Sequence, residues 1–165
     1  MRVLYVLIYT ETMALTFDTL EELVGAAPTE LGFTGWVTLS QEDVWAFAGA
    51  TRAPEWIHTD PERATCEGPF GGPVAHGFLT LSLATYFTTQ LLRSPPKMIG
   101  INYGLERVRF PAPVPVGSRV RASGHLLEAS PSGSAARLVV RLTYECDEAD
   151  KPPCVADVVS LIAPA

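Results

Sequence analysis

The sequence has little of what marks a nucleic-acid-binding, disulfide-bonded or membrane-spanning protein. Twelve lysines and arginines stand against 18 aspartates and glutamates, so no broad basic surface is available for a phosphate backbone. Only three cysteines are present, Cys66, Cys146 and Cys154, and their spacing contains no C-x-x-C pair. Neither a disulfide framework nor a zinc knuckle is therefore expected, and the reducing cytoplasm is the predicted location.

Long apolar runs are also missing. Residues 3–9 are mostly apolar, but this run is too short to span a bilayer, and no good signal-peptide cleavage site follows it. We expect no membrane anchor. Two interpretations of residues 1–13 stay open: an additional edge strand over residues 3–9, or an extension ahead of a true start at Met13. Residues 14–165 are expected to form one domain, because 47% of the sequence is apolar and can supply a substantial core.

Capping signals predict three short helices in the first half of the sequence. The residues at 18–21 resemble a capping box, and Ser40 is a good N-cap for a helix over residues 41–50. Residues 60–62 combine an N-cap aspartate, a proline at the first helical position and a first-turn glutamate. His58 is therefore expected to lie at the junction between two elements.

The second half predicts one long helix followed by strands. The helix runs from His76 to about Leu92 and is apolar on nearly every side, so we expect the rest of the domain to enclose it. Apolar and polar residues then alternate, which predicts strands over about residues 98–110, 117–129, 137–144 and 154–163. Helices followed by an antiparallel meander predict an α+β fold with a central helix wrapped by a sheet. Pairing of exposed sheet edges predicts a homodimer.

Two features place a proton-transfer group near an anion site. His58 follows two apolar residues, Trp56 and Ile57. Desolvation by these side chains would lower the pKa of His58 and keep its imidazole neutral. Gly77 lies in the first turn of the long helix, where unpaired N–H groups and the helix dipole favour an oxyanion. Each feature has a plainer explanation on its own, because histidines are readily buried and glycines serve backbone geometry.

Three segments together resemble the MaoC-like hydratases of the hot-dog superfamily, and more closely their NodN-type branch. These segments are residues 56–61, 68–77 and 102–114, and the resemblance extends over about residues 14–163. It implies a single hot-dog domain, a homodimer, and a hydro-lyase of fatty-acid metabolism. The implied reaction is reversible addition of water to a trans-2-enoyl thioester, giving the (R)-3-hydroxyacyl product. Coenzyme A or an acyl carrier protein is the implied substrate handle.

The resemblance also assigns roles to residues of this sequence. His58 matches the histidine of an Asp-x4-His dyad that activates water, and Gly77 matches the backbone donor that polarises the thioester carbonyl. The aspartate position is occupied by Ala53, whose methyl group can neither orient an imidazole nor accept a proton. Glu55 is a candidate substitute carboxylate. Three interpretations stay open: a weak hydratase, a hydratase that uses Glu55, or a non-catalytic thioester-binding homologue or accessory subunit of an active hydratase.

Further residues are candidates for contact with the substrate. We expect aromatic side chains, residues at the helix start and one hydroxyl further along the long helix to line the pocket. These candidates are Trp56, Phe70, Gly72, His76, Phe78 and Thr85. Each aromatic side chain also fits a plain core role. The three histidines are widely separated and lack paired ligand spacing, so no metal or other cofactor is expected.

Overall fold

The computed structural model describes residues 14–165, and the edge strand considered for residues 3–9 lies outside them. The elements are β1 (Leu15–Thr16), α1 (Leu20–Gly25), β2 (Thr29–Phe33), β3 (Val37–Thr38), α2 (Gln41–Thr51), α3 (Trp56–Thr59), α4 (Pro61–Glu67), α5 (Gly77–Ser82), α6 (Ala84–Leu91), β4 (Leu92–Arg93), β5 (Met98–Arg109), β6 (Arg119–Ser132), β7 (Ala135–Cys146) and β8 (Val155–Pro164). None of the described helices is long and apolar enough to cross a membrane.

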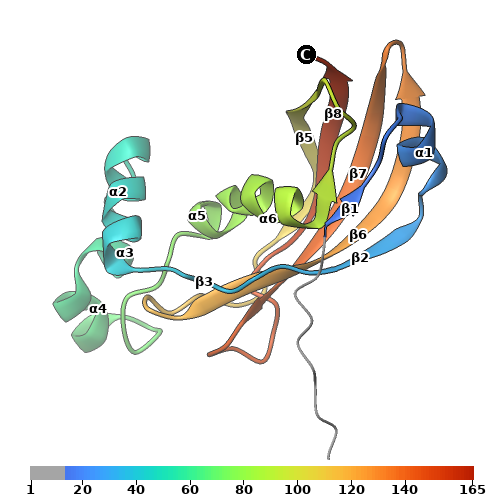
Figure 1. Ribbon diagram of the computed structural model, residues 1–165. Helices are drawn as coiled ribbons and strands as arrows, with labels where there is room; N and C mark the ends of the chain where they lie inside the picture. Colours follow the sequence, from blue (N-terminus) through green and yellow to red (C-terminus); the bar gives the residue numbers. More distant parts are fainter. Residues whose placement is uncertain (1–13) are drawn as a thin grey trace, which may run out of the picture.

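One antiparallel sheet forms the body of the molecule and curves around the α5–α6 helix pair (Figure 1). Its strand order is β2-β6-β7-β8-β5, with β3 pairing to β6, while β1 and β4 form a separate parallel pair. The four long strands cover the ranges predicted from alternation to within a few residues. The predicted α+β arrangement of a central helix wrapped by a sheet is therefore confirmed.

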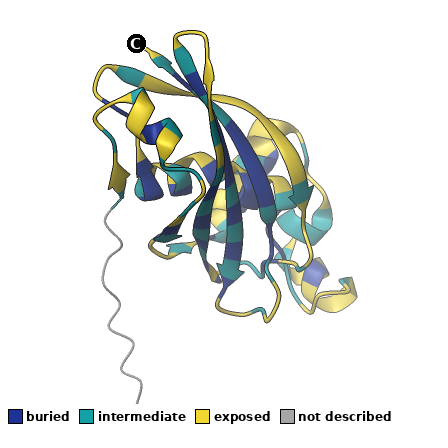
Figure 2. Cartoon of the chain, turned by 90° about the vertical axis from the view of Figure 1, so that its right-hand side faces the viewer, coloured by how far each residue is buried: buried dark blue, intermediate teal, exposed yellow. Residues whose placement is uncertain are grey.

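The core lies between the inner face of the sheet and the helix pair. On β7 the predicted inward residues are all buried, namely Leu138, Val140, Leu142 and Tyr144, and Figure 2 shows buried positions on the long strands. Phe87 of α6 is fully buried, and its ring meets the Tyr144 ring edge-on at a centroid distance of 5.4 Å. The Tyr144 hydroxyl donates to the Leu81 carbonyl at 3.3 Å. This contact satisfies the one polar atom of a buried tyrosine.

The long helix differs from its prediction in two respects. It begins at Gly77 with His76 as its N-cap, and it is divided into α5 and α6 at Leu83. It is also not enclosed, because Phe78 is 69% exposed and Tyr86 is 54% exposed. The expectation of full enclosure is wrong for a single chain, since the sheet covers only one side of the helix pair.

β2 was not predicted from the sequence pattern. The five residues from Thr29 to Phe33 bury only Leu31, and Gly32 adopts a positive φ of 81° where the register to β6 shifts. A bulge places two residues opposite one and breaks the period-2 alternation that identifies a strand.

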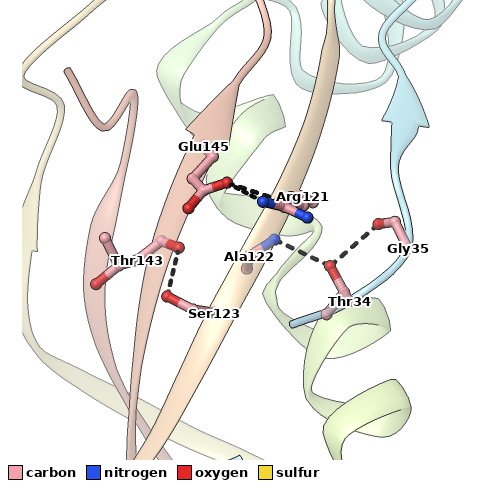
Figure 3. Close-up of polar contacts among 7 residues, drawn as sticks. All are labelled: Thr34, Gly35, Arg121, Ala122, Ser123, Thr143 and Glu145. Carbon is pink, nitrogen blue, oxygen red and sulfur yellow. Dashed lines mark hydrogen bonds and ion pairs between the residues drawn. The ribbon is translucent and has the colours of Figure 1, made fainter. Parts of the chain in front are cut away.

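Thr34 attaches the end of β2 to β6 (Figure 3). Its N–H donates to the Ala122 carbonyl at 2.8 Å, and its hydroxyl accepts from the Ala122 N–H at 2.9 Å. The same hydroxyl donates to the Gly35 carbonyl at 3.1 Å. On the outer face nearby, Arg121 of β6 pairs with Glu145 of β7 at 2.7 Å. The chain leaving β2 is thus held against the sheet before it turns toward α2.

Three helices begin at or next to the caps predicted from the sequence. Ser40 and Asp43 form a reciprocal capping box at the start of α2. The Asp60 carboxylate accepts from the Arg63 N–H at 3.0 Å and begins α4. The first helix is capped by Thr19, one residue after the start of the capping-box sequence. Figure 1 shows α2, α3 and α4 grouped beyond the amino end of α5.

We expect Phe87→Ala to lower the free energy of unfolding by about 3–5 kcal/mol, because it removes a fully buried ring and leaves a cavity against Tyr144. The measurement is urea denaturation followed by circular dichroism. Thr89→Ala on the exposed side of the same helix is the control, with an expected change within about 0.5 kcal/mol. Equal losses for the two variants would contradict the packing described here.

Candidate active site

The short helix that carries His58 is held in place by α2. The Gln41 side chain donates through Nε2 to the His58 carbonyl at 2.9 Å, and the Trp45 indole N–H donates to the Thr59 carbonyl at 2.9 Å. Both donors come from one side of α2 and both acceptors lie at the end of α3, where helix carbonyls lack intrahelical partners. The orientation of α3 is therefore set by side chains of α2.

The His58 ring contacts the chain that leads into α5. Its Nδ1 lies 2.7 Å from the Val74 carbonyl oxygen. A carbonyl only accepts hydrogen bonds, so Nδ1 carries the proton of the neutral ring and Nε2 keeps a lone pair. Burial lowers the pKa of His58 below 6.5, with a smaller lowering from His76 and partial opposition from the Val74 hydrogen bond and the Glu55 charge. At neutral pH the ring is thus an uncharged base.

His76 stacks against His58 at a centroid distance of 3.9 Å and an angle of 32°. It is only 6% exposed, and its Nε2 lies 3.0 Å from the Ala53 carbonyl, to which it donates. Its Nδ1 is buried with no partner in the described chain. Because His76 is the N-cap of α5, the stack places the His58 ring beside the amino end of this helix. The fold thus brings His58 near Gly77, across 19 positions of sequence.

Gly77 borders a cavity of about 340 Å³ at the amino end of α5. Phe70 and Phe110 also line it, together with a proline-rich turn at residues 111–113. A Cβ built on Gly77 would lie 3.2 Å from the Phe110 ring, tighter than ordinary contact. The lack of a Cβ at position 77 therefore lets the Phe110 ring pack against the start of α5. The first N–H groups of this helix have no intrahelical carbonyl acceptor, so they are available to a ligand.

The predicted substrate-contact residues do not all lie at one cavity. Phe70 lies with Gly77, whereas Thr85 lines a second cavity further along the helix pair. The guanidinium of Arg63 covers the Trp56 ring at 4.4 Å. Phe78 is exposed, with its ring 5.9 Å from that of Phe110. Gly72 and His76 line neither of these two cavities, and His76 instead contacts the His58 ring.

Neither Ala53 nor Glu55 supplies a carboxylate partner to the His58 ring. Ala53 presents its carbonyl to His76, and its side chain is a methyl group. Glu55 is exposed and begins α3 without a side-chain cap. Among residues 14–165, no carboxylate forms a hydrogen bond or ion pair with His58, whose ring nitrogen partner is a backbone carbonyl. Nor do the described residues include a cluster of three or more metal-ligating side chains.

Sequence reasoning missed three contributors to the site. No functional motif marks Gln41, Phe110 lies in the segment 102–114 but received no role there, and the Val74 carbonyl carries no side-chain signal at all. The proline-rich stretch after Phe110 belongs to the same segment, but nothing in its sequence indicates a contact with Gly77. Its closeness to Gly77 depends on strand pairing between distant segments.

The chain is similar to known proteins in sequence and in fold. The model of the MaoC-like domain matches residues 23–147. The chain is 46% identical to 3-hydroxyacyl-thioester dehydratase Z of Mycobacterium tuberculosis over 143 residues, which cover 86% of this chain and 94% of that protein. It is 40% identical to nodulation protein N of Rhizobium leguminosarum bv. viciae over 135 residues, covering 81% and 84% of the two chains. A solved structure, the monoamine oxidase regulatory protein of an Archaeoglobus species, matches with a TM-score of 0.74 and 25% identity, covering 93% of this chain and 99% of that chain.

We expect the His58 ring to titrate below its usual pKa of 6.5, as measured by NMR of the imidazole resonances between pH 4 and 8. The urea-unfolded protein, in which histidines titrate near about 6.5, is the reference. Because the unfolded chain gains a proton that the folded chain resists, the free energy of unfolding falls as pH drops through about 6.5. His58→Gln should reduce this pH dependence. A His58 titration at or above the unfolded value would contradict the assigned environment.

Proposed function

Because this chain belongs to the MaoC-like domain family, we propose that it is an acyl-thioester hydratase or dehydratase that uses His58 as its acid–base group. One observation carries the proposal. The neutral imidazole of His58 keeps a lone pair on Nε2 and lies beside the amino end of the helix that begins at Gly77. An imidazole base beside the helix turn that supplies a backbone oxyanion donor fits addition of water to a polarised enoyl thioester.

In the proposed hydration, the thioester oxygen accepts from the Gly77 N–H, and His58 Nε2 takes a proton from water. The water oxygen bonds to C3 while the C2=C3 π pair moves toward the carbonyl and forms an enolate. The proton on Nε2 then transfers to C2, which gives the 3-hydroxyacyl thioester and restores neutral His58. The (R) configuration is part of the proposal. Dehydration follows the same steps in reverse.

The alanine at position 53 limits the rate that this site can reach. A positioned acid or base typically contributes about 10²–10⁴ in rate, so a site in which His58 has no carboxylate partner is expected to be slow. Glu55 does not supply the missing group in this conformation, because no hydrogen bond joins its carboxylate to the His58 ring. We therefore propose a weak hydratase rather than one with a substituted dyad.

A second candidate is a non-catalytic thioester-binding homologue that serves as an accessory subunit of an active hydratase. The lack of a carboxylate contact at His58 within the described chain favours it, because binding of a thioester needs the Gly77 amide but no acid–base dyad. The same measurement separates the two candidates.

The expected substrate handle is coenzyme A or an acyl carrier protein. We infer no cofactor, since adding water to a conjugated double bond transfers no electrons to an external acceptor. Cys66, Cys146 and Cys154 are all free, and burial raises the pKa of Cys154 to about 12. Unpaired cysteines are consistent with our assignment of the protein to the reducing cytoplasm.

Hydration of crotonyl-CoA, followed by loss of enoyl absorbance, tests the function. We expect slow turnover by the wild type, a gain in kcat/KM of about 10²-fold or more for Ala53→Asp, and loss of activity for His58→Ala. The Ala53→Asp variant supplies a carboxylate on the loop that His76 already holds by its backbone.

Each remaining outcome has a distinct meaning. An inactive wild type that becomes active as Ala53→Asp would support the accessory-subunit candidate. Wild-type turnover unaffected by His58→Ala would overturn the assignment of the base. Absence of turnover and of crotonyl-CoA binding in all three proteins would overturn the proposed function.

We also propose a homodimer formed through β5. Within residues 14–165 this strand pairs only with β8, so one of its edges keeps unpaired N–H and C=O groups. Its large apolar side chains are exposed, namely Ile99, Ile101, Tyr103 and Leu105. An open edge with apolar side chains favours association with another chain, and two-fold symmetry lets β5 pair with its own copy.

Introducing like charges at this edge should separate the dimer. We expect the double variant Ile101→Glu, Tyr103→Glu to shift the mass measured by light scattering from dimer to monomer. Phe33→Glu is the control, because Phe33 is a similarly exposed apolar residue on β2, which lies at the opposite end of the strand order from β5. A wild type that is monomeric, or a double variant that stays dimeric, would contradict the β5 interface.

A further inference from the structure

A second cavity of about 390 Å³ lies between α6 and the inner face of the sheet. Its volume falls within the range of about 300–1,000 Å³ typical of small-molecule sites. The strand side is mainly apolar, with Leu138, Val140, Val158 and Ile162 as lining residues. The helix and β5 contribute the polar side chains of Thr85 and Asn102, and Ser160 of β8 lies opposite Asn102 in the strand register. The cavity lining therefore combines apolar and polar side chains.

Its position relates it to the thioester site. Thr85 lies eight residues after Gly77 in the helix pair, a separation of about 12 Å at the usual helical rise. An acyl chain whose carbonyl is held at Gly77 therefore has to run about two helical turns to reach the cavity. The inference below rests on the proposed function, because it needs the thioester to be held at that end.

Thr85 and Asn102 join the helix to β5 and keep unused hydrogen-bonding capacity. The Asn102 amide donates through Nδ2 to the Thr85 hydroxyl oxygen at 3.1 Å. The reverse contact from the Thr85 hydroxyl to Asn102 Oδ1 is 3.4 Å, which is long for an O–H···O bond. The hydroxyl proton of Thr85 and the carbonyl oxygen of Asn102 are therefore poorly used within the pair.

Two neighbouring hydroxyls differ in this respect. Thr88 and Thr89 also line the cavity, but each donates to a carbonyl of its own helix at 2.8 Å, to Ala84 and Tyr86 respectively. Such bonds back to the preceding turn are the usual role of a helical threonine. Thr85 instead directs its hydroxyl across the cavity wall to a side chain of β5.

We propose that this cavity binds the distal part of an acyl chain that carries a hydroxyl group, recognised by Thr85 and Asn102. A hydroxyl both donates and accepts, so it could replace the long Thr85–Asn102 contact of 3.4 Å by donating to the Asn102 carbonyl oxygen and accepting from the Thr85 hydroxyl. The chain on either side of that hydroxyl packs on the apolar strand wall. Both side chains are exposed, and a plain alkyl chain would remove them from water while leaving the Thr85 donor and the Asn102 acceptor only their long mutual contact, which is unfavourable.

Binding of saturated acyl-CoAs tests this inference without requiring turnover. Octanoyl-, decanoyl- and dodecanoyl-CoA are compared with their ω-hydroxy counterparts by isothermal titration calorimetry. We expect at least one ω-hydroxy compound to bind about three- to tenfold more tightly than its unsubstituted partner, the usual effect of a net hydrogen bond. The three lengths place the hydroxyl at different depths along the helix.

Variants identify the groups responsible. The double variant Thr85→Val, Asn102→Leu keeps similar volume and should remove or reverse the preference for the hydroxylated compound. Thr65→Val is the matched control, because the Thr65 hydroxyl donates to the Pro61 carbonyl on α4, away from the cavity lining. It should keep the wild-type preference. Circular dichroism checks that the double variant is folded. If it is not folded, binding of plain and ω-hydroxy acyl-CoAs to the wild type still tests the preference for a hydroxyl.

Two negative results are distinguishable. If the wild type binds the acyl-CoAs but shows no preference for any ω-hydroxy compound, the hydroxyl inference is wrong and the thioester site stands. If it binds none of the six compounds, the proposed function fails with it. A preference that persists in a folded double variant would also overturn the assignment to Thr85 and Asn102.

Discussion

The hydrogen bond between His58 Nδ1 and the Val74 carbonyl is the contact on which the site depends. It ties α3, which has no buried residue of its own, to the segment that enters α5. It also selects the tautomer that leaves Nε2 unprotonated. A single carbonyl thus sets both the place of the imidazole and the ring nitrogen that keeps a lone pair.

The body of the molecule and the helix that carries His58 are held by different kinds of contact. The sheet and the helix pair share a continuous core in which Phe87 and Tyr144 are fully buried. The short helix α3, which carries His58, relies instead on polar contacts from Gln41 and Trp45 of α2. The stacked ring of His76 joins the two parts, since it belongs to the start of α5 and holds the loop at Ala53. The side chain at position 53 takes no part in this contact, because His76 donates to the backbone carbonyl of Ala53.

Regular local patterns predicted much of the fold. Period-2 alternation identified β7 with its inward residues, and the caps at Ser40 and Asp60 marked α2 and α4. β2 escaped prediction because its bulge at Gly32 breaks the alternation. The division of the long helix at Leu83 and the exposure of its outer side also went unpredicted, since an apolar helix looks the same whether a sheet or a second chain covers it.

The sequence alone determined the residue types of the site: an imidazole at 58, a glycine at 77 and an alanine at 53, together with the elements that carry them. These follow from local signals, because caps and side-chain periodicity act over only a few residues. Tertiary structure decided which groups meet. The Val74 carbonyl, the His76 stack, the Phe110 ring over Gly77 and the Thr85–Asn102 pair join residues 16 to 33 positions apart, and only packing and strand pairing bring such segments together.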